Sequence, residues 1–327
     1  MSEIETGNTS AVQWVQLSAD FKGQRLDNFL LSRLKGMPKT RIYSMMRKGE
    51  IRINRKRVKP DYRIEGGEEL RLPPMRLPER EGPPPVPAGL GERINAAVLY
   101  EDDALMVINK PSGLAVHGGS GINLGLIESL RQLRPDAKML ELVHRLDRDT
   151  SGCILVAKKR SALRQMHEAL RDGKMKKTYH ALVFGRWPSR RQHVNAPLKK
   201  NELQSGERMV KVDDEGKASL TEFKVIERFA DYTLVAASPI TGRTHQIRVH
   251  AQFAGHSIAG DQKYSLDEDN RRAREIGVSR LFLHAASIGF PHPGTGKWLE
   301  VSAPYDEVLK GVVESQRQQG FFPINTD

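Results

Sequence analysis

The sequence of 327 residues has one cysteine and no long apolar run. A single cysteine, Cys153, cannot form an internal disulfide or a metal site built from several cysteines. Its place in the apolar segment 153–157 favours a small buried side chain over a catalytic thiol. No stretch of about 18 apolar residues is present, so we expect no transmembrane helix and no membrane partner. The polar N-terminal segment lacks the regions of a signal peptide, and we therefore expect a cytoplasmic protein.

Several signatures of catalytic or ligand-binding sites are missing as well. The segment 291–298 resembles a phosphate-binding loop, but Pro291 and Trp298 stand where Gly and Ser or Thr are required. Neither the HExxH pattern of zinc enzymes nor the GxSxG pattern of hydrolases occurs. His245 and His250 are five residues apart with no acidic residue nearby, so we expect no metal site.

Positive charge is what the chain has in excess. With 52 Lys and Arg against 40 Asp and Glu, the formal net charge is +12, which suits a polyanionic partner. Residues 24–63 hold thirteen basic residues and three acidic ones, so this short segment carries +10 of the total. The basic character therefore belongs to one N-terminal module.

The pattern of this module predicts two helices packed on a few short strands. Apolar residues recur at helical spacing over 26–34, and a glycine follows. A second helix is predicted to begin at Pro38 and end at Gly49. Short strands are expected over 51–58 and 69–72, which leaves the lysines and arginines at the surface.

Composition shifts predict four consecutive parts of the chain. They are a flexible lead-in, the basic module, a stiff linker rich in proline and glycine, and a larger domain, over residues 1–20, 21–72, 73–95 and 96–322. In the larger domain, strand signals outnumber helical ones and often follow one another without a helix between them. This favours an α+β fold with a largely antiparallel sheet over a doubly wound parallel one.

Three compact polar clusters lie in the larger domain, over residues 108–119, 144–152 and 238–250. Each cluster alone has an ordinary explanation, as turn glycines, a solvated run of charge, or a histidine bonded within the core. Three of them in one domain, each at a strand or turn boundary, favour a functional site.

Asp147 is the residue of these clusters with the clearest chemistry. It lies between Arg145 and Arg148 in the second cluster. An arginine of the third cluster could hold its carboxylate ionised where water is scarce. Such a carboxylate suits nucleophilic or general-base chemistry on a sugar or a base. The surrounding positive charge suits a substrate that carries phosphate.

The motifs HRLDRDTSG, GRTHQIRVH, KTYHALV and KPSG with VHGG resemble those of the RluA-type pseudouridine synthases. The basic module resembles an S4 RNA-binding domain. The resemblance runs from about residue 15 to about residue 320. It implies an S4 domain followed by a synthase domain with a mixed, largely antiparallel sheet and a central catalytic cleft. One departure is Ser265, which stands where the family pattern has glycine after the tyrosine.

The resemblance implies a role for each matching residue. Asp147 would be the catalytic aspartate, and Tyr179 would stack against the target base. Arg248 would pair with Asp147, and Arg145 would fill the space that the extruded nucleotide leaves. Further substrate contacts are expected from His117, His144, Arg243 and His245. The S4 domain is expected to bind RNA through Lys39, Arg41, Arg47, Lys48, Arg55, Lys56 and Arg57.

The reaction implied is isomerisation of uridine to pseudouridine in large-subunit (23S) ribosomal RNA, by a monomer, after the target nucleotide has left the helix. Both halves of the uridine stay in the pocket, so no cofactor is needed. Asp147 would act either as a nucleophile or as a base. Three alternatives stay open: a non-catalytic RNA-binding or ribosome-assembly factor, a pseudouridine synthase for another structured RNA, and a glycosylase that releases uracil.

Overall fold

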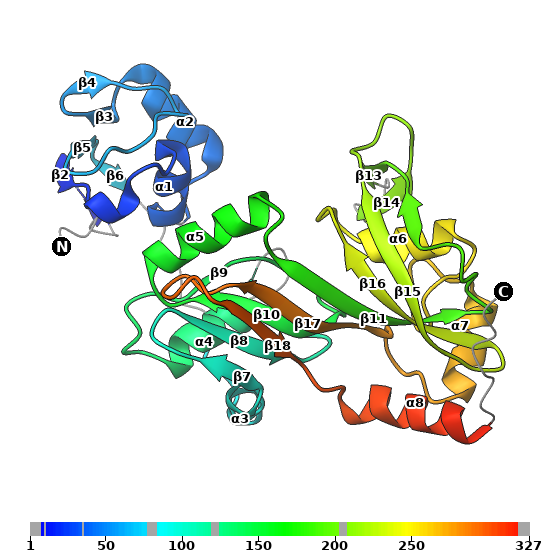
Figure 1. Cartoon of the computed structure of the whole chain (residues 1–327). Coiled ribbons are helices and arrows are strands. Elements are labelled where there is room, and N and C mark those ends of the chain that lie inside the picture. The colour runs from blue at the N-terminus through cyan, green and yellow to red at the C-terminus, as the bar shows by residue number, and fades with distance from the viewer. Residues whose placement is uncertain are drawn as a thin grey trace. The chain divides into compact units, whose positions relative to one another are not determined.

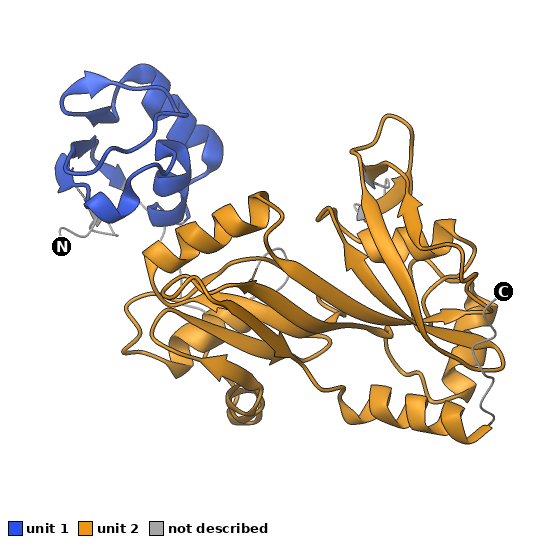
Figure 2. Cartoon of the chain, viewed as in Figure 1, with its two compact units in different colours: residues 1–84 blue, residues 85–327 orange. Residues whose placement is uncertain are grey.

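The computed structural model describes residues 8–9, 11–34, 36–76, 84–118, 124–202 and 208–319. The chain divides into two compact units, Met1–Pro84 and Pro85–Asp327, which Figure 2 shows in blue and orange. This division lies within the segment 73–95 that the sequence interpretation assigns to a linker.

Unit 1 contains the two predicted helices (Figure 1). After a short 3-10 turn, η1 (Ala19–Phe21), α1 spans Leu26–Arg33 and α2 spans Lys39–Lys48. Gly49 ends α2 with a φ of 69°, a left-handed conformation that glycine adopts without steric cost. Buried side chains of both helices, such as Leu30 of α1, form one apolar core with those of the strands.

Four short antiparallel strands complete unit 1, in the order β2-β5-β3-β4. β2 pairs with β5 along its whole length, although the sequence interpretation placed β2 in a flexible lead-in. Val15 is its one buried residue, and a single buried position gives too weak a pattern to indicate a strand. A further two-stranded ladder joins β1 to β6. The strands are β1 (Asn8–Thr9), β2 (Gln13–Gln16), β3 (Arg52–Ile53), β4 (Lys56–Arg57), β5 (Glu69–Leu72) and β6 (Met75–Arg76).

Unit 2 is built on a ten-stranded mixed sheet (Figure 1). The strands follow the order β12-β15-β16-β11-β17-β10-β8-β7, with β18 beside β17 and β9 beside β10. The pair β10–β17 is parallel, and the other pairs of this sheet are antiparallel. The predicted α+β fold with a largely antiparallel sheet is therefore confirmed.

The strands of this sheet are β7 (Val98–Glu101), β8 (Leu105–Lys110), β9 (Glu141–Leu142), β10 (Ser151–Ala157), β11 (Lys176–Phe184), β12 (His193–Asn195), β15 (Leu220–Arg228), β16 (Tyr232–Pro239), β17 (Leu283–Pro291) and β18 (Trp298–Ser302). A separate hairpin is formed by β13 (Leu198–Glu202) and β14 (Arg208–Val212). Cys153 is buried in β10, as predicted.

Six helices of the described residues belong to unit 2. They are α3 (Ala88–Ala96), α4 (Leu126–Leu133), α5 (Arg160–Arg171), α6 (Gln246–Phe253), α7 (Asp267–Glu275) and α8 (Glu307–Gln319). α3 occupies part of the expected linker, and neither α6 nor α7 is apparent in the sequence pattern. α6 is buried from Gln246 to Ala251, so it has no exposed polar face to produce a helical period. None of the described helices is long and apolar enough to cross a bilayer.

Candidate active site

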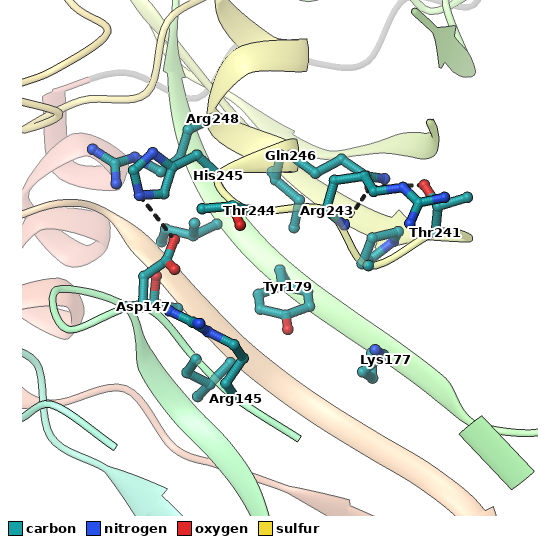
Figure 3. A pocket seen from close by; sticks show the side chains of 16 residues that line it. Arg145, Asp147, Lys177, Tyr179, Thr241, Arg243, Thr244, His245, Gln246 and Arg248 are labelled. Carbon is teal, nitrogen blue, oxygen red and sulfur yellow. Dashed lines mark hydrogen bonds and ion pairs between the residues drawn. The ribbon is translucent and has the colours of Figure 1, made fainter. Parts of the chain in front are cut away.

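A cavity of about 130 Å³ opens in unit 2 where three segments meet. They are the turn that precedes β10, the start of β11, and the loop between β16 and α6 (Figure 3). The polar clusters 144–152 and 238–250 both reach this cavity, whereas 108–119 does not line it. We call it the Asp147 cavity.

Asp147 stands at the wall of this cavity. Its side chain is 23% exposed, and its Oδ2 lies 3.7 Å from Nε2 of His245. The turn that carries it is closed by a backbone hydrogen bond of 3.2 Å from the Thr150 N–H to the Asp147 carbonyl. The next seven residues, β10, are all buried in the core. A buried strand therefore fixes the position of the carboxylate.

Tyr179 lines the same cavity from β11, opposite Ala237 of β16 in the sheet. Its side chain is almost fully buried, and this burial, together with the negative charge of Asp147, raises the pKa of Tyr179 above its usual range. The phenol therefore stays neutral at physiological pH. Lys177, two residues earlier, also lines the cavity, and burial lowers the pKa of its ammonium.

Arg248 reaches the cavity from α6, but its direct partner is not the expected one. Its Nε and Nη2 donate to the two carboxylate oxygens of Asp261 at 2.7 Å and 2.6 Å. The side chains of the pair are 6% and 0% exposed. Burial opposes the charge on the guanidinium, but Asp261 and, more weakly, Asp147 outweigh it and raise the pKa of Arg248. The expected ion pair between Arg248 and Asp147 is thus corrected: Asp261 holds Arg248, which acts on Asp147 through its charge.

His245 is the residue that faces Asp147 most directly (Figure 3). It has a φ of 53°, a left-handed conformation that is strained for a residue other than glycine and is enriched at functional sites. Its Nδ1 lies 2.7 Å from the hydroxyl of Tyr264, and that hydroxyl oxygen accepts the N–H of Val210 at 3.1 Å. Because the Asp147 carboxylate can only accept, the neutral imidazole carries its proton on Nε2, facing Asp147, and Nδ1 accepts the hydroxyl proton of Tyr264.

Burial lowers the pKa of His245, against an opposing effect of the Asp147 charge. The imidazole is therefore neutral in the resting site. Asp261 and Tyr264 are site residues that sequence reasoning missed. Two local signals were present: the family pattern in which Tyr264 precedes Ser265, and Gly260, whose φ of 77° marks a tight turn before Asp261.

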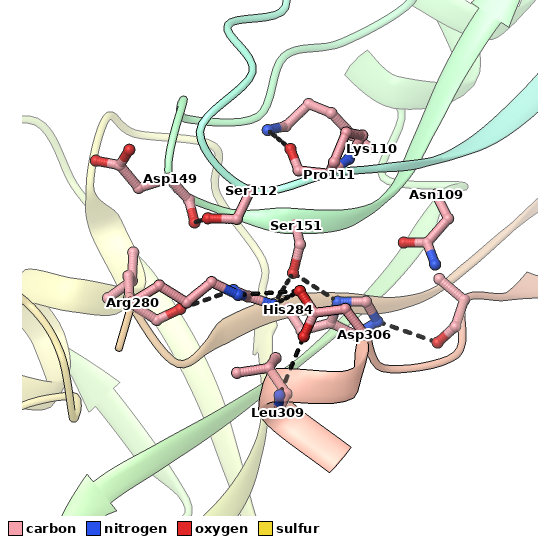
Figure 4. A network of polar contacts seen from close by, with 12 residues as sticks. Asn109, Lys110, Pro111, Ser112, Asp149, Ser151, Arg280, His284, Asp306 and Leu309 are labelled. Carbon is pink, nitrogen blue, oxygen red and sulfur yellow. Dashed lines mark hydrogen bonds and ion pairs between the residues drawn. The ribbon is translucent and has the colours of Figure 1, made fainter. Parts of the chain in front are cut away.

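The first polar cluster holds the backbone of the turn that follows Asp147, and Figure 4 shows Lys110, Ser112 and Asp149 of this arrangement. The fully buried Lys110 ammonium donates to the carbonyls of Pro111, Leu114 and Arg148 at 2.9, 2.8 and 2.9 Å. Ser112 donates its hydroxyl proton to the Asp149 carbonyl at 2.7 Å. Burial lowers the pKa of Lys110 to about 7, while the carbonyls favour the charged form because they accept its protons. The cluster is thus a positioning element.

A second buried network ties the start of β10 to β17 (Figure 4). Arg280 donates to the Ser151 hydroxyl oxygen at 3.0 Å, and that hydroxyl lies 2.8 Å from Nδ1 of His284. Nε2 of His284 lies 3.0 Å from the Ala303 carbonyl. Since a carbonyl can only accept, His284 carries its proton on Nε2 and accepts the Ser151 proton at Nδ1. Burial lowers the pKa of His284 to about 4, so it remains neutral.

Of the other predicted substrate-binding residues, two line the Asp147 cavity and two do not. Arg145 and Arg243 are exposed at the lining of the Asp147 cavity. His144 lies outside the lining, where its Nε2 accepts the N–H of Leu155 at 3.2 Å, and burial lowers its pKa to about 3. His117 is exposed and also lies outside the lining. The seven basic residues predicted to bind RNA in unit 1 are all exposed.

Comparison with known proteins agrees with this geometry. The family model described as RNA pseudouridylate synthase matches residues 104–253, and that of the S4 domain matches residues 24–70. The chain is 56% identical over 316 residues to the ribosomal large subunit pseudouridine synthase C of Escherichia coli (strain K12), covering 94% of this chain and 98% of that protein. It is 53% identical to the protein of the same name from Pasteurella multocida (strain Pm70), with 94% and 95% covered.

Among solved structures, human RNA pseudouridylate synthase domain containing 4 aligns with a TM-score of 0.58 and 25% identity, over 70% of this chain and 96% of that one. The chain belongs to the RNA pseudouridine synthase family and is an enzyme of that class, with an S4 domain before its synthase domain.

Proposed function

We propose that this protein isomerises uridine to pseudouridine in 23S ribosomal RNA of the large subunit. The support is its likeness, along almost the whole chain, to enzymes named ribosomal large subunit pseudouridine synthase C. It works as a monomer in the cytoplasm. The reaction breaks the glycosidic C–N bond, turns the uracil, and forms a C–C bond with transfer of one proton from carbon to nitrogen. All atoms come from the substrate, so no cofactor or metal takes part.

The observation that carries the proposal is the position of Asp147 beside Tyr179 and Arg248 in one cavity. Asp147 attacks the sugar or removes a proton from it, and both roles need the ionised form. Arg248 does not occupy the carboxylate, since Asp261 takes the hydrogen bonds of Arg248. The carboxylate therefore stays available to the substrate.

Tyr179 and Arg145 have complementary tasks in this proposal. The neutral phenol ring of Tyr179 forms a wall against which the flipped uracil stacks. Arg145 is exposed at the mouth of the Asp147 cavity, where its guanidinium fills the space left in the RNA stack. His245 orients Asp147, and Arg243 meets RNA phosphate at the rim. His144 acts through the backbone around the site, and the exposed His117 contacts the RNA outside the cavity.

The S4 domain of residues 21–72 supplies phosphate contacts outside the synthase domain of residues 96–322. The seven basic residues predicted to bind RNA are all exposed, which supports this role because phosphate contacts need accessible cations. They help to offset the cost of unstacking the target, which is a few kcal/mol.

The deciding experiment is Asp147→Asn, which keeps the shape of the side chain and removes its charge. We expect pseudouridine formation in 23S rRNA to fall at least about 1,000-fold while RNA binding changes little. Mapping of pseudouridine in rRNA from cells that lack this chain, with and without each variant, gives the readout. Near-normal modification by Asp147→Asn would overturn the assignment.

The same assay separates the alternatives. Binding by the wild-type protein without new pseudouridine would indicate an assembly factor. Release of free uracil would indicate a glycosylase. If cells without the chain still carry pseudouridine at the usual 23S positions, the substrate of this protein is another RNA.

A further inference from the structure

A groove of about 930 Å³ lies on unit 2, and it shares no lining residue with the Asp147 cavity. We call it the Arg228 groove. Five basic residues line it, and Glu222 is its one acidic lining residue. The basic residues are Lys176, Arg190, Arg191, Lys224 and Arg228. The carboxylate of Glu222 lies 3.5 Å from Nε2 of His193 in the same wall. With five cations against this one carboxylate, the groove as a whole is strongly positive.

Arg228 is the most unusual of these cations because it is only 4% exposed. Its Nη2 donates to the Trp187 carbonyl at 3.1 Å and to the Ser189 hydroxyl at 2.7 Å. Its Nε and Nη1 are buried and have no acceptor among the described residues. A buried charge without a counter-charge is costly, so an anion in the adjoining groove would stabilise it.

The strand register places Lys224 of the groove next to the site but on the other face of the sheet, whereas Arg228, opposite Thr233, falls on the face that carries Tyr179. Lys224 pairs with Ala236, one position along from the row that contains Tyr179 and Ala237. Since side chains alternate between faces, Lys224 points away from the face that carries Tyr179. At the start of β11, Lys176 lines the groove while its neighbour Lys177 lines the Asp147 cavity.

The spacing of the cations favours a chain of phosphates over a single small anion. Arg228 is opposite Thr233 of β16, which in turn is opposite Val183 of β11. Lys176 is thus seven positions along the sheet from Arg228, which corresponds to about 23 Å, and this odd number places the two side chains on opposite faces, so the groove reaches both faces of the sheet. Trp187 is 1% exposed, so its ring is not available to stack on bases. The groove therefore suits a nucleic-acid backbone read by charge alone.

We propose that the Arg228 groove binds the phosphate backbone of the substrate RNA outside the target nucleotide, as a second RNA-binding surface of the synthase domain. This inference rests on the proposed function, because the RNA that fills the groove is the one whose uridine enters the Asp147 cavity. The adjacent lysines at 176 and 177 mark where the RNA passes from one site to the other.

The test is a full-length triple variant, Lys176→Gln, Arg190→Gln and Lys224→Gln, whose three side chains are exposed, so the fold is retained. On a long 23S rRNA fragment we expect KM to rise about tenfold or more at unchanged kcat, and the slope of log KM against log salt to become shallower by about two to three. On a minimal stem-loop that holds only the target, we expect wild-type values.

The matched control removes three exposed cations of unit 2 outside the groove, with Arg271→Gln, Lys297→Gln and Lys310→Gln. An equal loss in the control, or an unchanged KM and salt slope in the groove variant, would overturn the inference. Wild-type activity on the long fragment is measured first. If the wild type forms no pseudouridine on the long fragment, the proposed function is wrong. If the wild type is active and the groove variant has the same KM and salt slope, only the inference about the groove is wrong.

Arg228→Gln separates a ligand site from a structural role. Removal of an uncompensated buried charge should leave the thermal unfolding midpoint unchanged or higher, while KM on the long fragment rises several-fold. A lower midpoint with unchanged KM would show that Arg228 only supports the loop that carries Trp187, and it would remove Arg228 from the site.

Discussion

At the scale of single residues, Asp261 controls how Arg248 meets Asp147. Breaking a buried ion pair from one side typically costs about 3–5 kcal/mol, because the remaining charge is left buried and unpaired. We expect Asp261→Asn and Arg248→Ala each to lower the unfolding free energy by about this amount. Each should also reduce the single-turnover rate severely, and the double variant should be little worse than either one. Rates and urea unfolding of all three variants are the measurement, and additive losses would contradict the pairing.

The family resemblance predicts that Asp147, Tyr179 and Arg248 gather in one site, but the contact that it implies for Arg248 is wrong. Arg248 and Asp261 are 13 residues apart, separated by the end of α6 and a turn, so no spacing rule pairs them. His144 shows the converse problem. A histidine beside a charged turn has the same sequence pattern whether it binds substrate or, as here, accepts a backbone N–H.

The hydroxyl of Tyr264 fixes the imidazole of His245, and this gives a prediction about pH. In Tyr264→Phe, Nδ1 of His245 loses the donor that favours the neutral ring, so its pKa should rise. Activity should then be lost at a higher pH on the acid side, and kcat at neutral pH should fall about tenfold with KM unchanged. The pH profile of kcat is the measurement. An unshifted acid limb would mean that the hydroxyl serves only to bind Val210.

At the scale of elements, β10 and β17 are joined by a parallel ladder and by the Ser151–His284 contact. The pKa of His284 is about 4 in the folded protein and about 6.5 in an unfolded chain. Between these pH values the unfolded state binds more protons than the folded state. The contribution of neutral His284 to the unfolding free energy is therefore complete above about pH 6.5 and is lost as the pH falls toward 4. From pH 7 to pH 5 we expect a loss of about 2 kcal/mol from this residue.

The matched variant is His284→Asn, whose shorter amide can still accept from Ser151 but does not titrate. Between pH 7 and pH 5, the unfolding free energy of this variant should therefore fall by about 2 kcal/mol less than that of the wild type. Denaturant unfolding of both proteins at the two pH values tests this. Equal pH dependence would show that His284 titrates normally in the fold.

Elements with a regular apolar period were predictable, and those buried on all sides or dominated by polar residues were not. α5 alternates buried and exposed positions at helical spacing, and β15 does so at strand spacing over its first half. α6 has neither pattern because the core surrounds it, and α7 is highly charged with Asn270 and Ala273 as its buried residues. Both helices depend on tertiary packing, which a short segment of sequence does not reveal.

At the scale of the whole molecule, the chain combines two units with separate apolar cores. The core of unit 1 and the main core of unit 2 have no residue in common. Each unit should therefore fold without the other. The net charge is less evenly shared, since residues 24–63 carry +10 of the +12. Deletion of residues 1–84 thus removes a cationic surface without touching the Asp147 cavity.

We expect the deletion variant to remain folded and to keep kcat at saturating rRNA, because every lining residue of the Asp147 cavity belongs to unit 2. Its KM should rise, and the dependence of log KM on log salt should become shallower by about one for each phosphate that the S4 domain no longer neutralises. If the Arg228 groove binds the same RNA independently, adding the groove substitutions should reduce the remaining slope further, by about as much as in the full-length protein. Steady-state kinetics over a salt series decides this. An unchanged slope after deletion would show that the S4 domain does not bind the RNA backbone.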